Sequence, residues 1–278
     1  MRVDAHHHLW QYTPKEYGWI DDSMQVLRRD FLPGDLEAEI AGVGIDATVA
    51  VQARQTLEET RWLLALAGQS AAIKGVVGWA PIAEERFVGT LEGLTQNPLL
   101  KGLRHVVQAE AEGFLDTPEF NRGIAAMLPT GLVYDILIFA RQLDEAARFV
   151  DRHPEQVFVL DHIAKPDILR GGFASWNGGI REIARRSNVV CKLSGMVTEA
   201  DWKGWTASSL EPYFDAVLDA FGPSRLMFGS DWPVLTVAAT YGQWAETVAS
   251  WLAPLSEGER AQIEGETASR IYRLGTED

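Results

Sequence analysis

The amino-acid sequence predicts a closed barrel of eight parallel strands and eight helices, a (β/α)8 or TIM barrel of the α/β class. Three observations support this fold. Short runs rich in β-branched residues recur at fairly even spacing, each is followed by a segment of helical periodicity, and a length of 278 residues suits one barrel. We expect a single domain over residues 1–278, because no linker or shift of composition interrupts the chain.

Eight segments have the pattern of strands, such as DATVAVQAR for the second and LVYDILIF for the fifth. An open doubly wound sheet is the competing arrangement. It usually has fewer strands and often a glycine-rich phosphate loop after the first one, which this sequence lacks. The expected strands are 2–8, 46–54, 73–81, 101–108, 132–139, 156–162, 188–194 and 225–232.

Amphipathic stretches between these strands predict the helices. In TLEETRWLLALAGQS, Leu57 and Leu64 fall near one face, while Glu58 and Glu59 can stay solvated. The first connection, residues 12–33, is unusually long, so we expect it to form part of a substrate enclosure.

Composition narrows the class of partner. Hydrophobic residues make up 46% and charged residues 23%, as in ordinary globular proteins. A net charge of −14 argues against binding nucleic acid or an anionic membrane surface and favours a small neutral substrate. Because no apolar run approaches the roughly 20 residues of a membrane span, and no signal-peptide core follows Arg2, we expect a cytoplasmic protein. The single cysteine, Cys191, excludes an internal disulfide and a thiolate metal cluster.

Three consecutive histidines lie in the first expected strand, within VDAHHHLW. Because side chains alternate along a strand, His6 and His8 share a face, about 7 Å apart, while His7 points the other way. A purification tag would be a longer run outside the fold. If the shared face looks into the barrel, the pair lies at the C-terminal end of the strand, where barrel active sites form. Satisfied core histidines are the alternative interpretation.

Polar residues also end other expected strands, where a packing layer would prefer Val or Leu. The sixth ends at His162, the eighth contains Asp231, and the fourth carries Arg104 and His105. Three imidazoles and one carboxylate gathered at one mouth would suit a divalent cation such as Zn²⁺ or Mn²⁺. The sequence therefore predicts one divalent metal ion, with zinc preferred. Its expected ligands are His6, His8, His162 and Asp231.

Seven segments together resemble the fuconolactonase and rhamnonolactonase branch of the amidohydrolase superfamily. They are DAHHHLW, VQARQTLEETRWLLALA, GVVGWAPI, KGLRHVVQ, FVLDHIAKP, CKLSGMV and RLMFGSDWPV, and the likeness runs from residue 3 to about residue 274. The resemblance implies a barrel of the metal-dependent hydrolase type that opens a sugar-acid lactone, such as L-fuconolactone or L-rhamnonolactone. It also supports the four expected ligands as the shared polar centre.

The sequence departs from superfamily members that hold two metal ions with a further histidine and a bridging lysine or glutamate. Its seventh strand offers Lys192 and Ser194 instead, and its fifth offers Asp135. One ion is therefore expected rather than two. Some lactonases of this neighbourhood work without a metal, so the resemblance also leaves a dispensable or absent ion open.

Ester hydrolysis needs an activated water, positive charge near the carbonyl oxygen and a proton for the departing alkoxide. We expect Asp231 to be the general base, with His162 and Arg104 polarising the carbonyl where no metal does so. The alternatives are a structural carboxylate that caps the loop before Pro233 and, for Arg104, a salt bridge at the rim. Expected substrate contacts are Trp10, Gln52, Arg54, His105, Asp135, Lys165 and Trp232.

Different arguments support most of these expected contacts. Arg54 shares a strand face with Gln52, tryptophan faces stack on sugar rings, and Asp135 stands in an apolar run that is costly for a charge without a partner. For Lys165 the alternative is a loop cap, and for Asp135 a buried ion pair. Other functions stay open at this point: a metal-dependent decarboxylase, a lactonase for a non-sugar dicarboxylate lactone, or a non-catalytic binding protein on the same barrel. A homo-oligomer also stays open.

Overall fold

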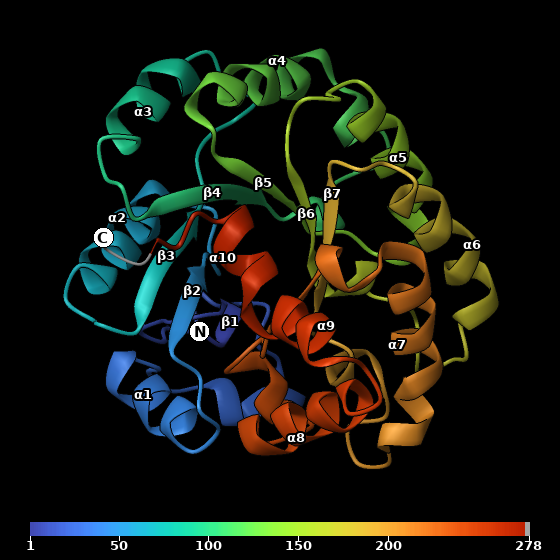
Figure 1. Cartoon of the computed structure of the whole chain (residues 1–278). Coiled ribbons are helices and arrows are strands. Elements are labelled where there is room, and N and C mark those ends of the chain that lie inside the picture. The colour runs from blue at the N-terminus through green and yellow to red at the C-terminus, as the bar shows by residue number, and fades with distance from the viewer. Residues whose placement is uncertain (276–278) are drawn as a thin grey trace.

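The computed structural model describes residues 1–275 as a ring of eight parallel strands in the order β1 to β8. Figure 1 shows the ring with helices around it. The predicted barrel is confirmed, and each expected strand is present. The strands are β1 Val3–His7, β2 Ala47–Val51, β3 Ile73–Gly78, β4 Leu100–His105, β5 Val133–Ile136, β6 Phe158–Leu160, β7 Val189–Leu193 and β8 Leu226–Phe228.

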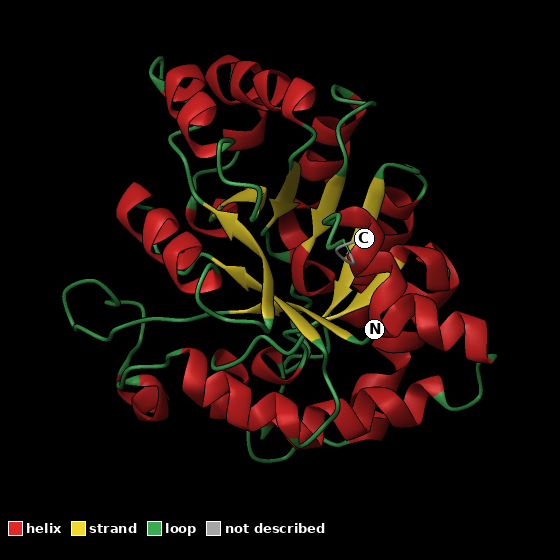
Figure 2. Cartoon of the chain, turned by 60° about the vertical axis from the view of Figure 1, so that its left-hand side comes forward, coloured by secondary structure: helices red, strands yellow, loops and turns green. Residues whose placement is uncertain are grey.

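Helices α1 to α8 follow the strands and cover the outside of the ring, as Figure 2 also shows. Thr56 caps the N-terminus of α2 through its hydroxyl, which accepts from the Glu59 N–H. No helix of residues 1–275 has the length and apolar character that crossing a membrane requires. The helices are α1 Pro33–Ala41, α2 Leu57–Ala67, α3 Phe87–Leu94, α4 Pro118–Met127, α5 Leu143–Asp151, α6 Phe173–Ala184, α7 Ala207–Phe221, α8 Tyr241–Leu252, α9 Glu257–Ala261 and α10 Thr267–Ile271.

The ring closes between β1 and β8 through backbone contacts just beyond β8. The N–H of His8 donates to the carbonyl of Trp232 at 2.6 Å, and the N–H of Asp231 donates to the carbonyl of His6 at 2.8 Å. Asp4 adds a side-chain link, because its carboxylate accepts from the backbone N–H and the hydroxyl of Ser230 at 2.9 and 2.6 Å. Closure of the barrel therefore fixes the position of Asp231 next to the histidines of β1.

A shift in the pairing of β1 with β2 separates two residues that simple alternation would put together. The register changes between Asp4 and His7. Asp4 contacts the hydroxyl of Tyr241 on α8, outside the ring, whereas His6 contacts Lys192 of β7 in the interior. His7 reaches the hydroxyl of Thr48 at 3.0 Å, so it lies on the opposite face from its neighbours, as predicted.

The lower part of the barrel interior is apolar. One cluster joins valines and other apolar side chains of seven strands, and Ala268 of α10 together with Tyr272 and Leu274 packs against it from below. Figure 1 shows α10 lying across this end of the ring. Burial of this layer leaves the opposite end, where the strands finish, free to carry polar groups. The cluster contains Val3, Ala5, Ala47, Val49, Val51, Val77, Val133, Val159, Val190 and Met227.

Candidate active site

A cavity of about 790 Å³ lies at the C-terminal ends of the strands. Loops after β1, β2, β4, β5, β6, β7 and β8 contribute to its wall. The long connection at residues 12–33 supplies Glu16, Trp19 and Met24, which agrees with its expected place in a substrate enclosure. The lining also includes the predicted catalytic residues Asp231, His162 and Arg104.

Asp231 and three histidines form the polar centre at the floor of this cavity. Oδ1 of Asp231 lies 3.3 Å from Nε2 of His8, 3.7 Å from Nε2 of His6 and 3.9 Å from Nε2 of His162. The Nε2 atoms of His6 and His8 are 3.2 Å apart. Residues far apart in the sequence thus meet at one point, as the pattern of strand ends predicted.

Hydrogen bonds on the far side of each ring set which nitrogen faces the centre. Nδ1 of His8 lies 2.8 Å from the carbonyl of Val51. Because a carbonyl oxygen only accepts, this nitrogen carries the proton, and Nε2 is left unprotonated with its lone pair free to bind a metal ion. Nδ1 of His162 lies 2.8 Å from the hydroxyl of Ser194. Nδ1 of His6 faces both Asp161, at 3.4 Å, and the ammonium of Lys192, at 3.1 Å. His6 therefore has a partner in either tautomer.

Burial keeps the imidazoles of His6 and His162 neutral. It lowers the pKa of His162 to about 4, although Asp231 and Asp161 oppose the shift. Burial and the charge of Lys192 together hold the pKa of His6 well below its usual value. Burial also disfavours the charged form of Asp231, but His162 and His8 beside it outweigh that effect and lower the pKa of its carboxyl. At neutral pH the site thus combines the neutral rings of His6 and His162 with the ionised carboxylate of Asp231.

This donor set suits a divalent metal ion. Four ligands at about 2.0 Å in a tetrahedron lie about 3.3 Å from one another. The distances of 3.2, 3.3 and 3.7 Å among His6, His8 and Asp231 are close to that value. A second group within reach of one ion joins His6 to Asp161 and His162. The residues present therefore fit a metal ion that takes nitrogen and oxygen ligands.

Two of the site residues, His162 and Lys165, lie in a strained segment of backbone. Residues 162–165 all have positive φ, from 46° to 61°, which makes one left-handed turn directly after β6. Such a conformation costs about 1–2 kcal/mol per residue for side chains other than glycine. The indole N–H of Trp176 on α6 donates to the carbonyl of Ile163 at 2.7 Å and holds the turn. The turn directs both His162 and Lys165 into the cavity.

Below the polar centre lies a buried group of charges. The ammonium of Lys192 contacts Asp135 at 2.6 Å and Asp161 at 3.0 Å. Arg104 contacts the second oxygen of Asp161 at 3.0 Å and also donates to the carbonyl of Gln52. Burial opposes ionisation of Asp161, but Lys192, contacts with His6 and the charge of Arg104 hold its pKa well below the usual range. This group fixes Arg104 and His6 from beneath.

Two of the seven expected substrate contacts, Arg54 and Lys165, line the cavity. Asp135 does not: it is fully buried beneath the centre, where Lys192 and the hydroxyl of Tyr272 are its partners. Its contacts are those of a buried ion pair, the alternative interpretation. Its predicted role in binding substrate stays a prediction.

The four other expected contacts are not among the residues that line the cavity, and their role in binding substrate stays a prediction. Trp10 and Trp232 both pack edge-on against Phe31, with ring centroids 5.3 Å away in each case. Gln52 is fully buried, and its amide donates to the carbonyl of Arg104. His105 stacks on a phenylalanine ring and contacts Glu110 at 2.8 Å, on the helix side of β4.

Glu59 is a residue whose position the sequence did not indicate. Helical periodicity placed it on the solvated face of α2, but it is fully buried. Its carboxylate accepts from the backbone N–H groups of Ala53 and Arg54, at 3.1 and 2.7 Å, and so holds the loop that forms the cavity wall after β2. Burial raises the pKa of Glu59 to about 7 despite these bonds. Its position in the first helical turn gave no signal of this role.

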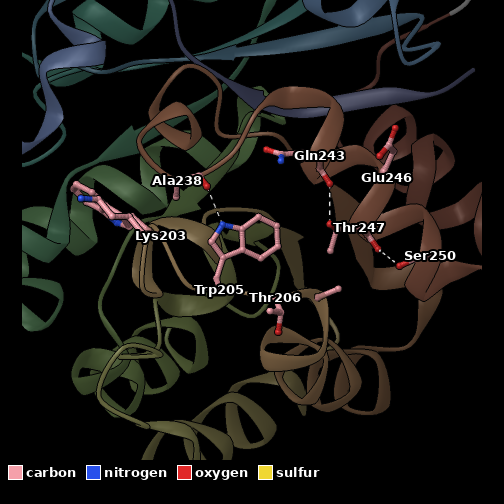
Figure 3. A pocket seen from close by; sticks show the side chains of 10 residues that line it. Lys203, Trp205, Thr206, Ala238, Gln243, Glu246, Thr247 and Ser250 are labelled. Carbon is pink, nitrogen blue, oxygen red and sulfur yellow. Dashed lines mark hydrogen bonds between the residues drawn. The ribbon is translucent and has the colours of Figure 1, made fainter.

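A second hollow, of about 540 Å³, lies outside the barrel between the loop after β7 and helix α8. Figure 3 shows it, with the indole N–H of Trp205 donating to the carbonyl of Ala238. Half of its lining residues are exposed polar ones, and it includes none of the predicted site residues. This hollow is therefore separate from the candidate site at the strand ends.

The fold and the site define a class: a (β/α)8 barrel that gathers histidine and carboxylate groups at its mouth in an arrangement able to hold a metal ion. The family described as Amidohydrolase matches residues 3–274. The chain belongs to the amidohydrolase family.

Relatives of known name cover nearly the whole chain. An L-fucono-1,5-lactonase from Burkholderia multivorans is 44% identical and covers 99% of this chain and 96% of its own. A protein of the same name from Burkholderia ambifaria is 36% identical, with coverage of 99% and 96%. The crystal structure of an amidohydrolase from Burkholderia multivorans with bound zinc has a TM-score of 0.96 at 43% identity, and covers 99% of this chain and 100% of that one.

Proposed function

We propose that the protein hydrolyses a sugar-acid lactone: water attacks the ester carbonyl and Asp231 acts as general base. One observation carries the proposal. Asp231, His8, His162 and Arg104 come from four strand ends and line a single cavity. Its volume of about 790 Å³ is in the range of small-molecule sites. The relatives named L-fucono-1,5-lactonase support a sugar lactone as the substrate.

Asp231 is suited to take the proton of the attacking water. Its lowered pKa keeps the carboxylate ionised at neutral pH. As the water oxygen bonds to the carbonyl carbon, Asp231 accepts the proton; the ring C–O bond then breaks, and the proton passes to the ring oxygen. The product is the open hydroxy acid, which ionises and releases one proton to solution.

Arg104 and His162 hold the other side of the reacting group. The guanidinium of Arg104 is only 3% exposed and is fixed by Asp161, so it offers a preorganised positive charge toward the carbonyl oxygen. Ser194 orients the ring of His162 so that Nε2 faces Asp231.

We further propose that one zinc ion binds between His6, His8 and Asp231, with His162 beside it. When bound, such an ion supplies a Lewis acid for the carbonyl and lowers the pKa of water. The donor distances support this assignment, and so does the zinc in the related Burkholderia multivorans structure.

A pH-indicator assay over a panel of uncharged five- and six-membered aldonolactones tests the function. Protein as purified, protein treated with chelator and chelated protein with zinc restored are compared, and the Asp231→Asn variant serves as the background for spontaneous opening. We expect acid release well above that background, loss after chelation and recovery with zinc. Acid release no faster than the variant, for every lactone and with zinc present, would overturn the proposal.

Metal analysis and thermal unfolding of the same samples test the ion separately. Full activity after chelation to below one-tenth of an ion per chain would overturn the zinc proposal and leave hydrolysis itself intact.

A further inference from the structure

Each cationic side chain that lines the cavity contacts a carboxylate. Among the described lining residues the lysines and arginines are Arg54, Arg104 and Lys165. Lys165 contacts Glu199 at 2.8 Å, Arg104 contacts Asp161 at 3.0 Å, and Arg54 forms an ion pair with Glu16. Each of these positive charges therefore has a carboxylate beside it.

Two of these ion pairs lie on opposite sides of the mouth. Arg54 follows β2 and meets Glu16 from the loop after β1. Lys165 follows β6 and meets Glu199 from the loop after β7. All four residues line the cavity, so a ligand reaching away from the catalytic centre toward either side meets a cation with its own acid beside it.

The Lys165–Glu199 pair is held in place rather than free in solvent. Both side chains are only 18% exposed. Lys165 stands in the left-handed turn that also carries His162, and its ammonium lies 5.4 Å from the ring centre of Phe139. The pair therefore has little freedom to open toward an incoming anion.

From this arrangement we propose that Glu199 and Glu16 are specificity residues that select an uncharged polyhydroxy lactone and exclude lactones bearing a carboxylate. The inference deepens the proposed function and rests on it. A hydroxyl group both donates and accepts, so it can bridge the ammonium of Lys165 and the carboxylate of Glu199. A carboxylate only accepts, and it would have to lie beside Glu199 or displace it, which places two like charges together.

The test uses two lactones that differ at one group: an aldono-1,4-lactone and the aldaro-1,4-lactone in which its terminal hydroxymethyl is oxidised to a carboxylate. We compare kcat/KM for both in the zinc-loaded wild type and in Glu199→Gln and Glu16→Gln. The wild type should prefer the aldonolactone. Each substitution should lower that preference, by about tenfold for Glu199→Gln, because Lys165 then lacks its carboxylate partner. The change should be smaller for Glu16→Gln, because Glu59 stays 3.9 Å from Arg54.

Two controls isolate the freed cation as the cause. Glu119→Gln removes an exposed acid that pairs with Arg122 on α4, and it should leave the preference unchanged. Lys165→Met combined with Glu199→Gln removes both partners, so it should not gain activity on the aldarolactone. A preference that stays the same in Glu199→Gln and Glu16→Gln, both folded and active on the aldonolactone, would overturn the inference. So would a wild type that opens both lactones equally well.

Binding separates this inference from the proposed function. Calorimetry of the two lactones with Asp231→Asn measures charge selection without turnover, and the Asp231→Asn/Glu199→Gln double variant is its counterpart. Weak binding of the aldarolactone that becomes tighter in the double variant supports the inference even where neither lactone is hydrolysed. Equal binding of the two lactones contradicts it.

Discussion

Three strands place an apolar residue and a charged residue two positions apart, both facing the barrel interior. The pairs are Val133 and Asp135 on β5, Val159 on β6 with Asp161 directly after its end, and Val190 and Lys192 on β7. The valines belong to the lower layer, which the C-terminal segment closes. The charged residues form the layer above, directly under the catalytic centre.

The two layers differ in what burial does for them. Burying a valine side chain stabilises the fold by roughly 1.5–3 kcal/mol, whereas burying a charge costs free energy unless a partner compensates it. In the upper layer Lys192 contacts both Asp135 and Asp161, and Tyr272 from below donates to Asp135. The lower layer therefore supplies stability, whereas the upper layer gives up part of that stability to hold a fixed arrangement of charges.

The largest effect should come from the base at the mouth. Asp231→Asn keeps the shape of the side chain but removes its ability to accept a proton, so kcat should fall by about 10²–10⁴-fold. Its melting temperature should change little, because the residue lies in the catalytic layer rather than the stabilising one. Lactonase kinetics and thermal unfolding of one preparation check both expectations. Near-normal turnover in a folded variant would reject Asp231 as the base.

A smaller effect should come from Glu59, because burial disfavours the charged form of its carboxyl group. Because its pKa rises from 4.5 to about 7 on folding, the folded state binds the proton more tightly. The contribution of Glu59 to stability is therefore greatest below pH 4.5 and is lost as the pH rises to 7, by about 3 kcal/mol in all. In Glu59→Gln this dependence should be absent.

Urea unfolding of wild type and Glu59→Gln at pH 5 and pH 8 measures the difference. The variant should gain stability relative to wild type at the higher pH. Glu58→Gln, an exposed neighbour on the same helix, is the matched control and should show no such change. An equal difference between variant and wild type at both pH values would show that Glu59 has its ordinary pKa in the folded protein.

The sequence was sufficient to predict the fold and to predict which polar side chains lie together at the mouth of the barrel. Strand order follows from alternating strand and helix patterns, and parallel strands of a barrel end at one mouth, so His8, His162 and Asp231 could be placed together without coordinates. The charged residues below them were visible as polar positions in apolar runs. Their ion-pair partners were not visible in the sequence. Asp135 pairs with Lys192 across the barrel interior, from β5 to β7, and the residue pattern alone does not give the relative register of these two strands.

Residues at the rim could not be predicted in the same way. Trp10 and Trp232 follow strand ends, yet both turn onto Phe31, because the fold of the 12–33 segment decides where they pack. Periodicity gave Glu59 a solvated face, but two free backbone N–H groups after β2 recruit its carboxylate inward. The packing of these side chains depends on loop conformation, which local sequence patterns do not determine.

The smallest effect that we predict comes from a change to the lower layer, on strand β6. Val159→Ala removes two carbon atoms from the lower layer, two positions from Asp161 and three from His162. We expect the free energy of unfolding to fall by about 2 kcal/mol, or about 5 °C in melting temperature, while kcat/KM stays within about twofold. Rigid packing within each layer is the reason that so near a change spares the chemistry. A tenfold loss of kcat/KM with an unchanged melting temperature would show that the two layers are coupled and that the lower one also positions the site.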